Sequence, residues 1–186
     1  MLDSSDVANA ILDRAHERAI SVSPLKLQKL MYYCQGYFLA SHGKRLFNED
    51  VQAWKHGPVV ESVYHQYKSL VRLPIPHIST GVYLSSSESV KDMIDYVLDS
   101  LGNLGGWALR NKTHNEKPWI ESYKASCSEI SDKQMTEFFT YELSSKQDRQ
   151  LASILDASEF ASVAADLHKL PTEINSEEDF VNWINA

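Results

Sequence analysis

The segment from Ser23 to Gly43 carries the clearest helix signal in the chain, and any fold must place its apolar face in a core. Ser23 is a residue type favoured at helix N-caps, and Pro24 fits the first helical position, where its missing N–H is not needed. Gly43 follows the last periodic residue and suits a C-cap. Gly36 costs about 1 kcal/mol relative to alanine inside a helix, so we expect a closely packed neighbour there. The residues at helical spacing that mark the apolar face are Leu27, Leu30, Met31, Cys34, Tyr37 and Phe38.

A small β element is expected after this helix. Residues 51–54 predict a short strand, and Gly57-Pro58 is expected to end it, with Pro58 opening the next helix. Segment 73–85 contains two prolines and β-branched residues, so it predicts an extended stretch and a second strand that could pair with the first. Residues 113–119 predict a loop, because Asn115 and Pro118 disfavour a continuing helix.

Further helices account for most of the remaining chain. They are expected over residues 5–19 with Ser4 or Ser5 as N-cap, over 58–71, from Ser86 or Ser87 to 101, over 107–113, after a capping box of Ser131 and Gln134, and in the C-terminal third, where Ser176 and Asp179 form a second capping box. The predicted fold class is therefore mainly α with minor β: a compact helical domain with a small two- to three-stranded β element, plus C-terminal helices.

Charge divides the chain of 186 residues unevenly. The net charge is −7, and residues 126–186 hold 12 Asp and Glu against 4 Lys and Arg. We interpret residues 1–145 as one domain and residues 146–186 as an acidic helical C-terminal extension, suited to a basic partner or to solvation. No apolar run approaches the roughly 20 residues that cross a bilayer. The acidic N-terminus does not resemble a signal peptide, so a cytoplasmic protein without membrane contact is expected.

Candidate catalytic and metal-binding residues are few. The two cysteines, Cys34 and Cys127, are far apart, and no Cys/His cluster has zinc spacing, so no metal site and no cofactor are expected. His56 and His114 each lie at the end of a predicted strand or helix, where a histidine could act as a general base or bond to the backbone. No motif for a nucleophile or for phosphate binding is present. An enzyme is therefore not expected.

Binding to a nucleic acid is also not expected. Lys26 and Lys29 share a helix side that we expect to be exposed, and Lys44-Arg45 follow the same helix. These four basic residues are few for binding a phosphate backbone, and the chain as a whole is acidic. Protein binding is better supported, since Trp and Tyr dominate interface hot spots. The aromatic residues near predicted turns are Trp54, Tyr64, Tyr67, Trp107 and Trp119.

Several motifs in order resemble the Panacea domain, also described as the phage-associated, SocA-like domain. The similarity covers roughly residues 5–143. One departure is Glu61, where many relatives have a proline soon after Gly-Pro-Val. The matching residues are Leu27, Lys29, Leu30, Tyr32 and Tyr33, then Ala53, Trp54, Gly57, Pro58 and Val59, then Val63, Tyr64 and Tyr67, then Thr113-His114 and Pro118-Trp119, and finally Phe138-Phe139.

This resemblance implies an antitoxin of a bacterial or prophage toxin–antitoxin pair. Its partner would be a cognate toxin, for which an alarmone-synthetase-type or another translation-blocking enzyme is a candidate. One branch of the family instead acts as a proteolytic adaptor that delivers its toxin to the ClpXP protease. The toxin, the mode of neutralisation and the oligomeric state stay open.

The matching residues divide into two expected roles. One group contacts the partner, and the other group builds the domain. The expected partner contacts are Trp54, His56, Tyr67, His114 and Trp119, and the expected structural residues are Leu27, Lys29, Leu30, Tyr33, Gly57, Pro58, Val59, Tyr64, Thr113 and Pro118.

Overall fold

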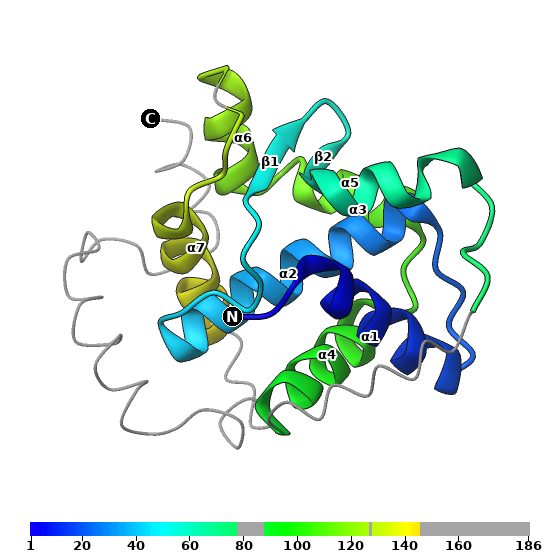
Figure 1. Cartoon of the computed structure of the whole chain (residues 1–186). Coiled ribbons are helices and arrows are strands. Elements are labelled where there is room, and N and C mark those ends of the chain that lie inside the picture. The colour runs from blue at the N-terminus through cyan, green and yellow to red at the C-terminus, as the bar shows by residue number, and fades with distance from the viewer. Residues whose placement is uncertain (78–87, 127, 146–186) are drawn as a thin grey trace.

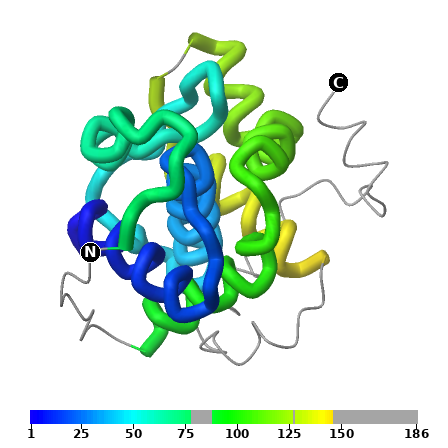
Figure 2. The backbone as a smooth tube through the Cα atoms, turned by 90° about the vertical axis from the view of Figure 1, so that its right-hand side faces the viewer, coloured from blue at the N-terminus to red at the C-terminus, as the bar shows by residue number. Residues whose placement is uncertain are grey.

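Helix α2 (Pro24–His42) is the centre of the fold, and the other elements surround it (Figure 1). The computed structural model describes residues 1–77, 88–126 and 128–145. Viewed from the side in Figure 2, α2 is ringed by the remaining helices and by the β-hairpin. The other elements are α1 (Ser4–Glu17), β1 (Val51–Trp54), β2 (Gly57–Val60), α3 (Glu61–Tyr67), η1 (Lys68–Leu70), α4 (Glu88–Leu101), α5 (Gly106–Thr113), α6 (Lys117–Lys124) and α7 (Asp132–Ser145). The mainly α fold class with a small β element is confirmed.

The predicted ends of α2 are confirmed. The Ser23 hydroxyl accepts a hydrogen bond from the Lys26 N–H at 3.4 Å, and Pro24 is in the first turn. Gly43 has a left-handed φ of 62° and donates its N–H to the Leu39 carbonyl. The helix buries more than the one predicted face. All residues from Lys26 to Ser41 are buried, because α1, α4, α5, α7 and the hairpin cover every side.

The prediction that Lys26 and Lys29 are exposed is wrong. Both side chains are buried. The Lys26 ammonium donates to the Gly102 carbonyl at 2.6 Å and to the Ser21 carbonyl at 2.9 Å. It therefore satisfies a carbonyl just beyond the C-terminal end of α4, where a positive charge is favoured. Burial also lowers the pKa of Lys26.

Helix α7 lies directly against α2 at Gly36. A Cβ atom on Gly36 would come within 2.0 Å of the Phe139 ring, so the expected close neighbour is confirmed. The Phe139 ring meets Tyr32, Tyr33 and Tyr37 edge to face, with centroids 4.7–5.9 Å apart. This aromatic packing fixes α7 on α2.

Two predicted helix starts are wrong. Asp3, rather than Ser4 or Ser5, caps α1, since its carboxylate accepts the Ser5 N–H at 2.8 Å. Residues 57–60 form β2 instead of opening a helix at Pro58, and α3 begins only at Glu61. Pairing with β1 outweighs the local preference of proline for a first helical turn. The acidic Glu61 at the start of α3 suits the helix dipole.

The remaining predictions have mixed outcomes. Residues 73–77 form no strand, and the rest of the predicted second strand lies outside the described residues. The predicted loop at 113–119 is wrong beyond Glu116, because Pro118 lies in the first turn of α6. The capping box is confirmed: Gln134 N–H donates to the Ser131 hydroxyl at 3.3 Å, and Ser131 N–H donates to the Gln134 side chain at 3.0 Å. The predicted extension 146–186 lies outside the described residues.

A candidate partner-binding surface around the hairpin

The β-hairpin is the element around which the predicted site residues gather. Strands β1 and β2 are antiparallel, with Trp54 opposite Gly57 and Lys55-His56 as the connecting loop. Gly57 has a φ of +94°, a conformation that L side chains rarely adopt. Segment 128–130 borders the other edge of β1 through two backbone hydrogen bonds: the Ala53 N–H donates to the Ser128 carbonyl, and the Ile130 N–H donates to the Val51 carbonyl, both at 2.8 Å.

Helix α2 holds β2 through two adjacent side chains. The Gln28 amide accepts the Val60 N–H at 2.7 Å and donates to the Val60 carbonyl at 3.3 Å. The Lys29 ammonium donates to the Pro58 carbonyl at 2.7 Å. These side chains replace the strand partner that this edge lacks among the described residues, so the hairpin is positioned by the central helix.

Lys29 occupies a tightly packed position beneath the hairpin turn. Its side chain is 0% exposed. A Cβ on Gly57 would lie 2.8 Å from both the Lys29 ammonium and the Thr113 hydroxyl, so no side chain larger than hydrogen fits there without a shift. Burial, followed by the charge of Arg110, lowers the pKa of Lys29 to about 7. A large fraction of this lysine is therefore neutral near physiological pH.

Helices α5 and α6 close the corner from the other side. The Trp119 indole N–H donates to the Trp54 carbonyl at 2.9 Å. The His114 ring stacks on Trp119 with centroids 3.8 Å apart. Burial, and then the nearby charges of Arg110, Lys29 and His56, lower the pKa of His114 to about 4. His114 is thus uncharged near neutral pH.

A buried carboxylate fixes the connection between α5 and α6. Glu116 accepts hydrogen bonds from the Tyr33 hydroxyl and from the Lys112 ammonium, both at 2.8 Å. Burial raises the pKa of Glu116, although Lys112 opposes this shift. Because Tyr33 belongs to α2, this network ties the turn between α5 and α6 to the central helix.

Three aromatic side chains around the hairpin are strongly exposed. Trp107 is 52% exposed, Tyr123 is 44% exposed and Tyr64 is 37% exposed. Within the described residues, no other Trp, Tyr or Phe reaches this level of exposure. Each lies against another ring of the corner, with centroid distances of 6.1 Å for Trp107 and His56, 4.8 Å for Tyr123 and Trp119, and 4.9 Å for Tyr64 and Trp54.

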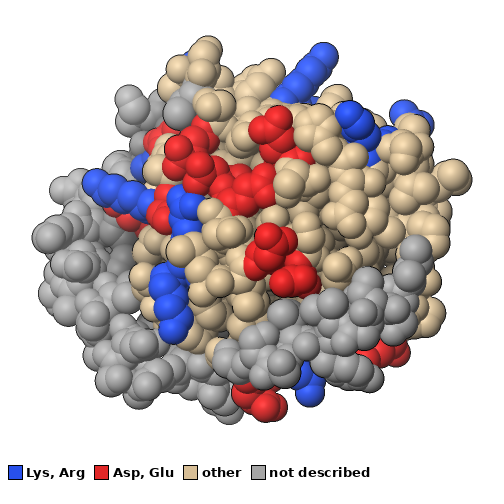
Figure 3. Space-filling model, viewed as in Figure 1, with Lys and Arg blue, Asp and Glu red and all other residues tan. Residues whose placement is uncertain are grey.

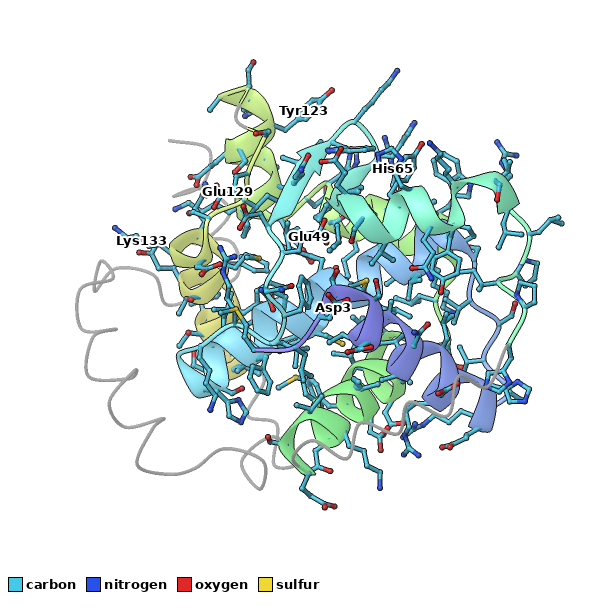
Figure 4. All side chains as sticks on the ribbon, in the orientation of Figure 1. Asp3, Glu49, His65, Tyr123, Glu129 and Lys133 are labelled. Carbon is cyan, nitrogen blue, oxygen red and sulfur yellow. The ribbon has the colours of Figure 1, made fainter. Side chains whose placement is uncertain are left out.

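We call this region the hairpin surface. It consists of Trp54, His56, Tyr64, Trp107, His114, Trp119 and Tyr123. In Figure 4, Tyr123 lies on one side of the hairpin, on α6, and His65 lies on the other side, on α3. Exposed aromatic rings over a rigid base are typical of protein interfaces.

The structure brings together most of the predicted partner contacts. Trp54, His56, His114 and Trp119 meet at the hairpin surface, but Trp119 is buried there, with only 8% of its surface exposed. Tyr67 does not join them: its hydroxyl donates to the Asn9 side chain on α1 at 3.4 Å, and its ring packs on the core.

The expected structural residues are buried, with one exception. Leu27, Lys29, Leu30, Tyr33, Gly57, Pro58, Val59, Thr113 and Pro118 are buried. Tyr64 is the exception, because its side chain is 37% exposed and lies against the Trp54 ring rather than in the core. Trp107 is among the aromatic residues near predicted turns but not among the expected partner contacts, and Tyr123 is in neither group. Tyr123 follows Trp119 by one helical turn of α6, and this signal was lost because α6 was not predicted.

Charge differs between the hairpin surface and the neighbouring face. Figure 3 shows acidic side chains gathered in the middle and upper left of the view, and Figure 4 places Asp3, Glu49 and Glu129 in that region. Glu49 has a structural task there, since it accepts hydrogen bonds from the Ser4 hydroxyl and from the Ser62 N–H, both at 2.8 Å. It thereby links the starts of α1 and α3.

The described residues contain no recognisable metal site, catalytic histidine arrangement or membrane-spanning helix. There, no group of three His, Cys, Asp or Glu side chains could hold a metal ion. Neither His56 nor His114 is hydrogen bonded to a carboxylate or a nucleophile in the same residues. No helix in this part of the chain has the length and apolar character needed to span a membrane.

Comparisons with known proteins point to one family. The profile of the family described as "Antitoxin SocA-like, Panacea domain" matches residues 27–120, which run from α2 to α6 and include most of the hairpin surface. A curated protein named Antitoxin SocA, from Caulobacter vibrioides (strain NA1000 / CB15N), is 33% identical over 129 residues, which cover 63% of this chain and 69% of that protein. No solved structure matches.

Proposed function

Because the chain belongs to the SocA-like antitoxin family of the Panacea domain, we propose that it neutralises a cognate toxin by binding it directly through the hairpin surface. Family membership supports an antitoxin role. The contact surface and the mode of neutralisation are inferred from the residues. The partner is a toxin protein, and a translation-blocking enzyme, such as one of the alarmone-synthetase type, is the first class to test.

The observation that carries this proposal is the placement of the exposed aromatic side chains. Trp107, Tyr123 and Tyr64 come from three different helices and surround one hairpin. Exposed tryptophan and tyrosine residues supply large contact area with few rotatable bonds, so they lose little entropy on binding. The rings beneath them are held by hydrogen bonds and stacking, which keeps the surface preformed.

Neutralisation by binding requires no chemistry from the antitoxin. A stoichiometric complex covers the active site of the toxin or blocks substrate entry. We expect the covered surface of the toxin to become protected from solvent in proportion to the amount of antitoxin added, until the complex is saturated. The residues of domain 1–145 are sufficient for this contact in our proposal, and the acidic extension 146–186 adds a second contact to a basic toxin.

The test is co-expression with the product of the neighbouring reading frame. We expect that product to arrest growth alone, and we expect this chain to restore growth and to co-purify with it. Trp107→Ala and Tyr123→Ala should each weaken the complex by roughly 30-fold, which corresponds to a hot spot of about 2 kcal/mol. Leu73→Ala is the matched control, because Leu73 is also exposed but lies outside the hairpin surface.

Two outcomes would contradict the proposal. If the product of the neighbouring reading frame does not arrest growth, or if it forms no complex with this chain, it is not the cognate toxin and the proposal fails. Equal effects of Leu73→Ala and Trp107→Ala would move the contact away from the hairpin surface.

Delivery of the toxin to the ClpXP protease is the other mode of neutralisation open to this family. A strain that lacks the protease separates the two modes. Under direct binding, growth is restored with or without the protease. Under delivery, toxicity returns when the protease is deleted, although the complex still forms.

A further inference from the structure

Basic side chains from three elements converge at the hairpin surface. Lys29 comes from α2, Arg110 from α5, and His56 from the loop of the hairpin, with His114 just after α5. They are close enough that their charges act on one another: Arg110 disfavours the charged form of Lys29, and all three disfavour the charged form of His114. Within the described residues, none of the four forms an ion pair with a carboxylate.

Arg110 differs in this respect from the other half-buried arginines. Arg14 pairs with Glu17 and Asp95, Arg18 pairs with Asp95 and Asp99, and Arg45 pairs with Asp50 and Asp132. Among the described residues, Arg110 instead donates only to the neighbouring Asn111 side chain, at 3.0 Å, and its guanidinium lies 5.8 Å from the Trp107 ring centroid. The fold supplies acids to the other half-buried arginines and leaves Arg110 without a counter-charge in the described part of the chain.

Two hydrogen-bonding atoms at this place are also unpaired. Arg110 Nε and His114 Nε2 are buried and have no partner among the described residues. A buried polar atom without a partner costs about 1–3 kcal/mol, so each one needs an explanation, of which a bound water, an ion or a group of a binding partner is one. The guanidinium fork of arginine has the geometry that fits a carboxylate.

We propose that the hairpin surface receives an aspartate or glutamate side chain of the bound toxin at Arg110, beside Trp107. This proposal rests on the proposed function, since the carboxylate belongs to the toxin. The acidic group meets the guanidinium, while the exposed face of Trp107 packs against the apolar neighbours of that residue. Tryptophan and arginine are the residue types most enriched in hot spots, and they lie together here.

A protein carboxylate fits these observations better than a nucleic acid. The chain has a net charge of −7, and the face next to the hairpin carries a concentration of acidic side chains (Figure 3). A phosphate backbone needs a row of exposed cations. Here Lys29 is buried and the pKa of His114 is lowered to about 4, so these two side chains add little accessible positive charge beside Arg110. A single acidic side chain within an otherwise apolar contact matches that pattern.

The test measures binding of the purified toxin to Arg110→Glu, Arg110→Gln and wild type. We expect Arg110→Gln to weaken the complex by about 30-fold and Arg110→Glu to weaken it further, since reversal adds repulsion. The matched control is Arg72→Glu, which makes the same charge change at an exposed arginine outside the hairpin surface. Thermal melts should show all three variants folded, because Arg110 forms no ion pair in the described residues.

A charge exchange identifies the toxin residue. Surface Asp and Glu positions of the toxin are replaced by Lys one at a time, and we expect one replacement to restore binding to Arg110→Glu while weakening binding to wild type. If Arg110→Glu behaves like Arg72→Glu, or if no replacement restores binding, the carboxylate contact is refuted. Trp107→Ala still reports on the hairpin surface in that case, so the proposed function is judged separately.

A nucleic-acid ligand is the remaining outcome of this design. The probe is a short RNA hairpin or DNA duplex titrated into the full chain at physiological salt. Binding that is lost in Arg110→Glu but kept in Arg72→Glu would make a phosphate the ligand of Arg110. That result would also overturn the proposed contact.

Discussion

Gly57 is the position where one added methyl group should test the whole corner. The backbone there has a φ of +94°, and a Cβ would lie 2.8 Å from both the Lys29 ammonium and the Thr113 hydroxyl. We therefore expect Gly57→Ala to destabilise the domain through two separate causes, backbone strain and steric displacement of Lys29. Only the second cause tests the contact between the hairpin turn and Lys29 of α2.

The expected magnitude follows from these two contributions. An L residue in a left-handed conformation costs about 1–2 kcal/mol. Moving the Lys29 ammonium weakens its 2.7 Å hydrogen bond to the buried Pro58 carbonyl, and an unsatisfied buried group costs about 1–3 kcal/mol. Together they predict a loss of about 3 kcal/mol in the free energy of unfolding, or a fall in Tm of roughly 6–12 °C for a chain of this size.

Urea unfolding followed by tryptophan fluorescence measures this loss, and Gly43→Ala is the matched control. Gly43 also has a positive φ, of +62°, but no atom of the described residues lies within 4 Å of its added Cβ. The strain and the change in unfolded-state entropy are then common to both variants. We expect Gly43→Ala to lose only about 1 kcal/mol, so the difference between the variants reports the contact with Lys29 and Thr113.

A double variant decides whether Lys29 is the cause. In a Lys29→Met background, the extra cost of Gly57→Ala over Gly43→Ala should shrink, because the ammonium is no longer held beneath the turn. Equal losses in Gly57→Ala and Gly43→Ala would refute the packing argument. An extra cost that is unchanged without Lys29 would assign it to Thr113 alone.

Three further predictions concern α2, α7 and their contacts. Lys29 has a pKa lowered to about 7 in the folded chain, so the unfolded state binds more protons above that pH. Stability should therefore rise from about pH 7 to about pH 9 by up to about 1.4 kcal/mol per pH unit; Lys29→Met should flatten this rise in urea titrations at each pH, and a parallel profile would show that Lys29 stays charged. Gly36→Ala should lower the free energy of unfolding by about 1–3 kcal/mol, because the added methyl group overpacks against Phe139 even though alanine favours helices. An unchanged Tm in calorimetry would disprove the 2.0 Å approach. Ser131→Ala removes the hydroxyl that caps α7 and should cost about 1 kcal/mol in the same assay, whereas Thr, which keeps the hydroxyl, should restore most of it.

Local signals predicted local structure well. Ser23, Pro24 and Gly43 marked both ends of α2 correctly, because a helix cap depends on groups only a few residues away. The capping box at Ser131 was predicted for the same reason. Pro58 misled the prediction, since its preference for a helix start was outweighed by pairing with β1, which no local window contains.

The candidate site was predicted only in part. The aromatic and histidine residues near turns were recognised, and Trp54, His56, His114 and Trp119 do lie together. Their exposure was not predictable, because it depends on which helix covers which ring. The order of the motifs along the chain carried the family resemblance, but that order does not indicate which residues face outward.

The sequence by itself determined where α2 begins and ends, the mainly α class and the membership of a family. It did so because caps, helical periodicity and motif order are properties of neighbouring residues. Only the tertiary structure decided that Lys29 is buried beneath Gly57, that Tyr64 and Trp107 are exposed, and that Arg110 has no acidic partner in the described residues. Those properties depend on contacts between segments tens of residues apart, where burial and charge pairing are set by the packing of whole elements.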